Sequence, residues 1–113
     1  MNFDLEERTT KFSEEIIELC KKVPKNTVTI PVLDQLIRCG TSIGANYVEA
    51  SGASSKKDFK NKIFICLKEA KETKYWLRLL VKSDQNYKEA CCKLWQEAHE
   101  LTLIFSKITR STN

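Results

Sequence analysis

Apolar residues recur every three or four positions along the whole chain, and no stretch alternates them with a period of two. Spacings of three and four place side chains on one face of an α-helix, whereas a period of two indicates a strand. Glycine and proline interrupt the pattern at only five positions. The pattern therefore predicts four helices, over about residues 4–22, 30–50, 56–82 and 87–109.

The fourth of these segments carries the most regular pattern. Its apolar positions alternate steps of four and three over three heptads, at Tyr87, Cys91, Leu94, Ala98, Leu101, Phe105 and Ile108. A repeat of 3.5 residues is typical of helices that pack nearly parallel to one another. Because the connecting segments are short, successive helices should run in opposite directions. We therefore expect one all-α domain over residues 1–113, an antiparallel up-and-down four-helix bundle.

Two glycines, Gly40 and Gly44, fall inside the second predicted helix. They are one turn apart and so share a face, where a neighbouring backbone can approach closely. The apolar period stays in phase through both, which favours a continuous helix. The alternative is a helix that breaks at residues 39–42.

The third predicted helix has more apolar side chains than one buried stripe requires. Beyond the seam that starts at Phe59 and ends at Leu80, five further large apolar residues point elsewhere: Phe64, Ile65, Tyr75, Trp76 and Leu79. One helix of a lone bundle needs only one buried stripe. A second burying surface is therefore expected, and another copy of the chain can supply it. The five residues are the candidate oligomer interface.

The chain has a small excess of basic residues, 19 Lys and Arg against 15 Asp and Glu, with a net charge of +4 and a pI of about 8.8. Seven basic residues lie along the third predicted helix: Lys56, Lys57, Lys60, Lys71, Lys74, Arg78 and Lys82. Basic residues interleaved with aromatic ones can contact phosphates and stack on bases, so these seven are a candidate site for RNA or DNA. The alternative is a solvated helix face whose charge nearby Glu69 and Glu72 balance.

The acidic and polar residues of the middle helices favour a structural role. Glu69 and Glu72 share a helix face, as an acid–base pair would, but no nucleophile or metal-ligand set accompanies them. We expect them to form a polar network with Arg38 and Asn46. No enzymatic activity, cofactor, metal or small-molecule substrate is expected.

Cysteine usage and hydropathy indicate a cytoplasmic protein. The five cysteines include no C-x-x-C pair, and the chain has a single histidine, so the spacing of a zinc site is missing. Free thiols that act as small core hydrophobes in a reducing compartment are expected instead. The longest run without a charged residue is ten, Cys39 to Val48, which is well below the roughly 18 of a membrane span.

Three stretches closely resemble one family. They are R-x-G-T-S-I-G-A-N at residues 38–46, S-K-K-D-F at 55–59 and K-E-A-x-E-T-x-Y-W-L at 68–77. Together with residues 4–25, they resemble the bacterial four-helix-bundle proteins also called 23S rRNA intervening-sequence proteins. The resemblance spans about residues 4–81. It implies a homopentameric ring without enzymatic activity, similar in fold to accessory proteins of diversity-generating retroelements, basic pentamers to which nucleic-acid binding is attributed.

These observations lead to two hypotheses of different classes. The first is a non-enzymatic oligomeric bundle whose basic outer face binds RNA or DNA. The second is a protein-interaction scaffold or assembly adaptor that does not contact nucleic acid.

Overall fold

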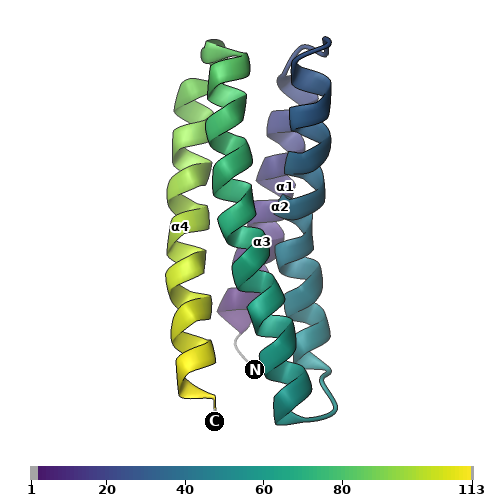
Figure 1. The fold of residues 1–113 in the computed structure, drawn as a ribbon, viewed down its shortest axis with the longest axis vertical. Helices are drawn as coiled ribbons and strands as arrows, with labels where there is room; N and C mark the ends of the chain where they lie inside the picture. The colour runs from purple at the N-terminus through teal and green to yellow at the C-terminus, as the bar shows by residue number, and fades with distance from the viewer. Residues whose placement is uncertain (1–2, 113) are drawn as a thin grey trace.

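The computed structural model describes residues 3–112 as an all-α fold. Its elements are the helices α1 (Phe3–Lys22), α2 (Thr29–Ser51), α3 (Lys56–Ser83) and α4 (Lys88–Ser111), with a single 3-10 turn, η1 (Gln85–Tyr87), before α4. Each helix begins and ends within two residues of its expected bounds, and the described residues contain no strand. Successive helices run in opposite directions (Figure 1). The expectation of a four-helix, all-α fold is confirmed.

The bundle is elongated, with extents of 44 × 20 × 19 Å. α3 lies between α2 and α4 and packs along both, while α1 packs mainly against α2 (Figure 1). α3 therefore has two edges along its length, and one of them faces α2 while the other faces α4. This arrangement decides which side chains of α3 meet which partners.

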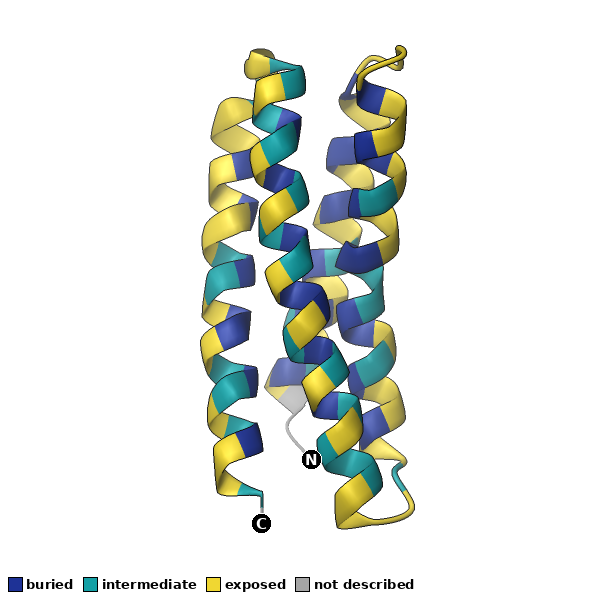
Figure 2. Ribbon diagram, in the orientation of Figure 1, coloured by how far each residue is buried: buried dark blue, intermediate teal, exposed yellow. Residues whose placement is uncertain are grey.

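Buried residues lie along the inner faces of the helices (Figure 2), and they form one hydrophobic core cluster. Phe12, Leu36, Leu77 and Phe105 are fully buried, one from each helix. The seam expected on α4 is buried from Cys91 to Phe105, and its two end residues are partly buried. The helices are amphipathic in the way that the spacing of apolar residues predicts.

The two glycines of α2 both face α1, but only Gly40 is at a distance too close for a larger side chain. α2 continues without a break through Gly40 and Gly44, so the continuous helix is confirmed. A Cβ at Gly40 would lie 3.0 Å from both Cγ1 and Cγ2 of Ile16, and one at Gly44 would lie 3.4 Å from the backbone oxygen of Thr9. Hydrogen at the Cα atom of Gly40 allows α1 to approach α2 more closely than a larger residue would, whereas the distance at Gly44 is that of an ordinary van der Waals contact.

Side chains in the loops fix where two helices begin. The Asn26 carboxamide oxygen accepts hydrogen bonds from the backbone N–H groups of Val28 and Thr29, both at 2.9 Å. The Ser55 hydroxyl accepts one from the N–H of Asp58 at 3.0 Å. Such caps satisfy donors that have no partner within the helix. Within residues 3–112, no helix is both long and apolar enough to cross a bilayer.

Candidate nucleic-acid interface

The seven basic residues singled out from the sequence all lie on α3. Five of them are exposed, and Lys60 and Lys74 are partly buried. Lys74 and Arg78 lie on the edge of α3 that faces α4, because Lys74 contacts His99 and Arg78 borders a hollow with Trp95. Near the start of the helix, the Lys60 ammonium lies 6.0 Å from the centre of the Phe64 ring. The seven residues, here called the basic row, therefore follow the outer side of α3 and reach the α3–α4 edge at Lys74 and Arg78.

The acidic residues of α3 lie on its opposite edge, towards α2. Arg38 Nη1 of α2 donates to Glu69 Oε2 at 3.2 Å, and its Nη2 donates to Glu72. Trp76 Nε1 also donates to Glu72, at 3.2 Å. Asn46 takes no part in this network, because its amide group bonds to the backbone oxygen and hydroxyl of Ser42 within α2.

In the alternative interpretation of the sequence, Glu69 and Glu72 balance the positive charge of the basic row. In the structure, Arg38 engages both carboxylates instead. Glu69 and Glu72 form ion pairs with Arg38. Elsewhere, Arg8 pairs with Glu97 and Glu100, and two further pairs join Lys62 to Glu49 and Lys21 to Glu18. Within residues 3–112, none of the seven basic residues has an ion-pair partner. Their charge is available to an anion outside the chain.

The α3–α4 edge also carries an aromatic pair. The rings of Trp95 and His99 stack with a centroid separation of 5.2 Å and an interplanar angle of 11°. Lys74 Nζ lies 3.1 Å from His99 Nδ1 and 5.1 Å from the centre of the Trp95 ring. Trp95 is not among the seam residues expected on the fourth helix, and the sequence did not lead us to connect it with the basic row. Two rings four residues apart on a helix were the signal that could have identified this pair.

The five residues expected at an oligomer interface fall into two groups. Phe64 and Tyr75 are 48% and 55% exposed. Ile65 is partly buried, and Trp76 and Leu79 pack against the core of the same bundle. Trp76 and Leu79 therefore do not point away from the core, as the excess of apolar side chains had suggested, and their part in an oligomer interface stays a prediction. α3 is flanked by both α2 and α4, so its buried arc is wider than the single stripe assumed from the sequence.

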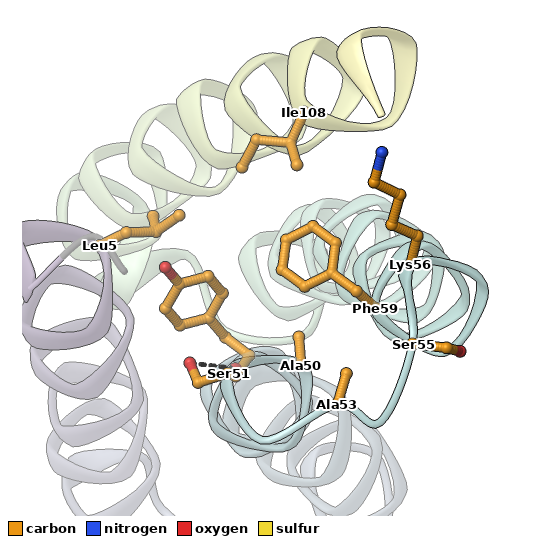
Figure 3. Close-up of a pocket in the computed structure, with 9 residues that line it drawn as sticks. Leu5, Ala50, Ser51, Ala53, Ser55, Lys56, Phe59 and Ile108 are labelled. Carbon is orange, nitrogen blue, oxygen red and sulfur yellow. Dashed lines mark hydrogen bonds between the residues drawn. The ribbon is translucent and has the colours of Figure 1, made fainter. Parts of the chain in front are cut away.

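A hollow of about 560 Å³ opens at the end of the bundle where the α2–α3 loop approaches the last turns of α4 (Figure 3). Phe59 and Ile108 face each other across it, and Ala50 and Leu5 line its inner wall. Lys56, the first residue of the basic row, lies at its rim (Figure 3). Among the described residues that line the hollow, all are apolar or carry hydroxyl groups apart from Lys56.

The thiols pack as core side chains. Cys20, Cys39, Cys66 and Cys91 are buried and free, and Cys92 is exposed. Burial raises the pKa of Cys66 to about 12 and that of Cys20 and Cys91 to about 11, because the apolar surroundings disfavour the thiolate. Among the described residues, no three His, Cys, Asp or Glu side chains are grouped so as to hold a metal ion.

The family described as 23S rRNA-intervening sequence protein matches residues 1–107 of this sequence. The chain belongs to the 23S rRNA-intervening sequence protein family. Among solved structures, a protein of unknown function from the S23 ribosomal protein family of Bacteroides thetaiotaomicron is 33% identical. The alignment covers 94% of this chain and 98% of that chain, with a TM-score of 0.83. No curated protein matches the sequence.

The stretches that carried the resemblance have packing roles in this member of the intervening-sequence family. Residues 38–46 supply Arg38 and the glycines that lie against α1, and residues 68–77 supply Glu69, Glu72 and Trp76. The family match also extends past residue 81 to residue 107, and so includes most of α4 with Trp95 and His99.

Proposed function

We propose that this intervening-sequence protein is a non-enzymatic, self-associating bundle that binds RNA or DNA through the basic row of α3. The observation that carries the proposal is the separation of charge across α3. Glu69 and Glu72 are engaged by Arg38 on the α2 edge, whereas the seven basic residues have no ion-pair partner within residues 3–112.

Unpaired basic residues on one helix suit a phosphate backbone. Each Lys or Arg that contacts a phosphate releases a condensed counterion, and this release gives affinity that falls steeply with salt. α3 has 28 residues, and at about 1.5 Å per residue its basic row can follow several phosphates of one strand. Binding of this kind requires no sequence-specific contact.

Self-association would strengthen such binding. Phe64 and Tyr75 on α3 leave apolar surface exposed, and so do Ile17, Ile30 and Ile37 on the α1–α2 side of the bundle. A closed ring forms through contacts between two different patches, so a chain with two apolar patches is suited to one. In the homopentamer that the family resemblance implies, the basic row would be repeated and its avidity for a polyanion raised.

The proposal is tested by binding of fluorescently labelled 23S rRNA fragments, measured by anisotropy over a range of salt concentrations. The native chain should bind at low salt, and a variant with Lys71, Lys74 and Arg78 changed to Glu should lose most of that affinity. The slope of log K against log salt is negative, and its magnitude should decrease by about 2 when three phosphate contacts are lost.

A matched variant keeps the same change in net charge away from α3. Lys11→Glu, Lys22→Glu and Lys107→Glu reverse three exposed charges on α1 and α4. This control should retain most of the affinity of the native chain. Equal losses in the two triple variants, or no binding by the native chain at low salt, would refute the proposed site. A stoichiometric protein partner that resists nuclease treatment would instead support the scaffold hypothesis.

A further inference from the structure

Trp95 is placed beside the basic row without being needed for the core. The buried seam of α4 is complete from Cys91 to Phe105 without it, and its side chain is 36% exposed. His99 stacks against the indole, and the Lys74 ammonium lies near both rings. The three side chains form an ordered group of two aromatic rings and a cation at the α3–α4 edge.

A hollow of about 230 Å³ lies next to this group. It is bordered by Trp95, Cys91 and Cys92 of α4 and by Leu77, Arg78 and Val81 of α3. Its walls are mainly apolar, and of the described residues that line it, only Arg78 is charged. A flat, uncharged ring system attached to a negatively charged chain would match this combination of apolar walls, indole and guanidinium.

We propose that this hollow takes an unpaired base of single-stranded RNA or DNA, with Trp95 as the stacking surface. The base would lie between the indole and the aliphatic side chain of Val81, which is partly buried. Aromatic side chains stack on the faces of all bases, and an arginine guanidinium adds a cation–π contact. The inference rests on the proposed function and adds to it the form of nucleic acid that is bound.

The surrounding charge agrees with this occupant. Lys74 and Arg78 flank the hollow, and Lys71 and Lys82 continue the row by about one turn on either side. None of these four has an ion-pair partner within residues 3–112, so each can meet a phosphate of the same strand. In a duplex the bases are stacked inside the helix and cannot enter a recess on a protein surface. Bases in single strands and loops can be splayed out and stacked on aromatic side chains.

The test compares single-stranded and duplex forms of one labelled oligonucleotide of about 20 nucleotides, which is long enough to cross the site. Anisotropy is measured with the native chain, Trp95→Ala and Trp95→Phe, in RNA and in DNA. Trp95→Ala should weaken single-strand binding by about tenfold and duplex binding by less than about twofold, and Trp95→Phe should lose less because a ring remains. Leu103→Ala, an exposed apolar residue on α4 outside the hollow, is the matched control and should bind as the native chain does.

A second measurement leaves Trp95 in place. In Trp76→Phe, Trp95 is the only tryptophan, and a base that stacks on it should quench its fluorescence as the single strand is added. No quenching on saturation with the single strand, or equal weakening of both strand forms by Trp95→Ala, would overturn the inference.

The two proposals fail in different ways. If charge reversal at Lys71 and Lys82 abolishes binding but Trp95→Ala leaves it unchanged, the stacking site is wrong and the basic row stands. If the native chain binds neither strand form at low salt, the proposed function itself is wrong.

Discussion

The Arg38 guanidinium of α2 lies 3.2 Å from the Glu69 carboxylate of α3, whose side chain is only 7% exposed. Glu69 is therefore a buried carboxylate with a cationic hydrogen-bond partner on the neighbouring helix. Half of the Arg38 side chain is exposed, so water screens part of the attraction. The larger effect is that Arg38 satisfies a carboxylate that would otherwise be buried without a donor.

Arg38→Ala should lower the free energy of unfolding by about 1–3 kcal/mol, because it leaves the Glu69 carboxylate buried and unpaired. Urea unfolding followed by circular dichroism measures the change. In the Arg38→Ala background, Glu69→Gln should recover part of the loss, since an amide is less costly to bury than a charge. Additive effects of the two substitutions would show that the pair does not couple α2 to α3.

The two glycines of α2 should respond differently to alanine. Replacing glycine within a helix gains about 1 kcal/mol of helix propensity. At Gly44 the new Cβ meets the Thr9 oxygen at 3.4 Å, an ordinary contact, so Gly44→Ala should be stabilising. At Gly40 it lies 3.0 Å from both branches of fully buried Ile16, so Gly40→Ala should be neutral or destabilising. Thermal unfolding of the two variants measures the difference in stability. A larger gain in stability from Gly40→Ala than from Gly44→Ala would contradict the prediction.

Self-association should depend on the exposed side chains of α3 and not on its half-buried ones. Tyr75→Glu should lower the mass measured by light scattering while leaving the helical circular dichroism intact, because Tyr75 is 55% exposed. Trp76→Glu should instead destabilise the bundle, because Trp76 packs against its core. Gln96→Glu adds the same charge at an exposed position of α4 and should change neither property. A native chain that remains monomeric at high concentration would refute self-association.

Stability should fall at alkaline pH. Burial raises the pKa of Cys66 from 9.0 to about 12, so the unfolded chain loses this proton at lower pH than the folded chain does. The contribution is fully present below about pH 9 and is lost as the pH rises from there through the folded pKa. The slope is at most about 1.4 kcal/mol per pH unit for each such thiol. Urea unfolding from pH 7 to about 10 measures it.

Cys66→Ala isolates the contribution of one thiol. The variant should show a shallower decline of stability with pH than the native chain, whatever its stability at neutral pH. Identical slopes in the two proteins would mean that ionisation of Cys66 does not contribute.

The course of the helices follows from local pattern. Hydrogen bonds within a helix join residues four apart, and the apolar residues of α4 mark one face over three heptads. The helices and their apolar faces can therefore be predicted from residues that are close together in the sequence. The close approach of α1 at Gly40 was predictable for the same reason. The resemblance to the intervening-sequence family could also be recognised without a structure, because residues 38–46 and 68–77 carry it as continuous stretches of sequence.

The partners of α3 depend on how each helix is rotated and shifted against its neighbours, which packing of the whole core decides. Helical spacing placed Glu69, Lys74 and Trp76 on faces of α3, but it did not show that Trp76 packs against the core or that Lys74 meets α4. Tertiary packing turned Glu69 towards Arg38, left Lys74 beside His99 and widened the buried arc to include Trp76. The sequence by itself therefore determined the four helices and the positions of their charges. The pairing of Arg38 with Glu69 and Glu72 was also expected from the sequence. Only the tertiary structure decided that Asn46 bonds to Ser42 instead of joining this network, and that the seven basic residues of α3 have no ion-pair partner within residues 3–112, because such contacts depend on how the side chains are placed in the folded chain.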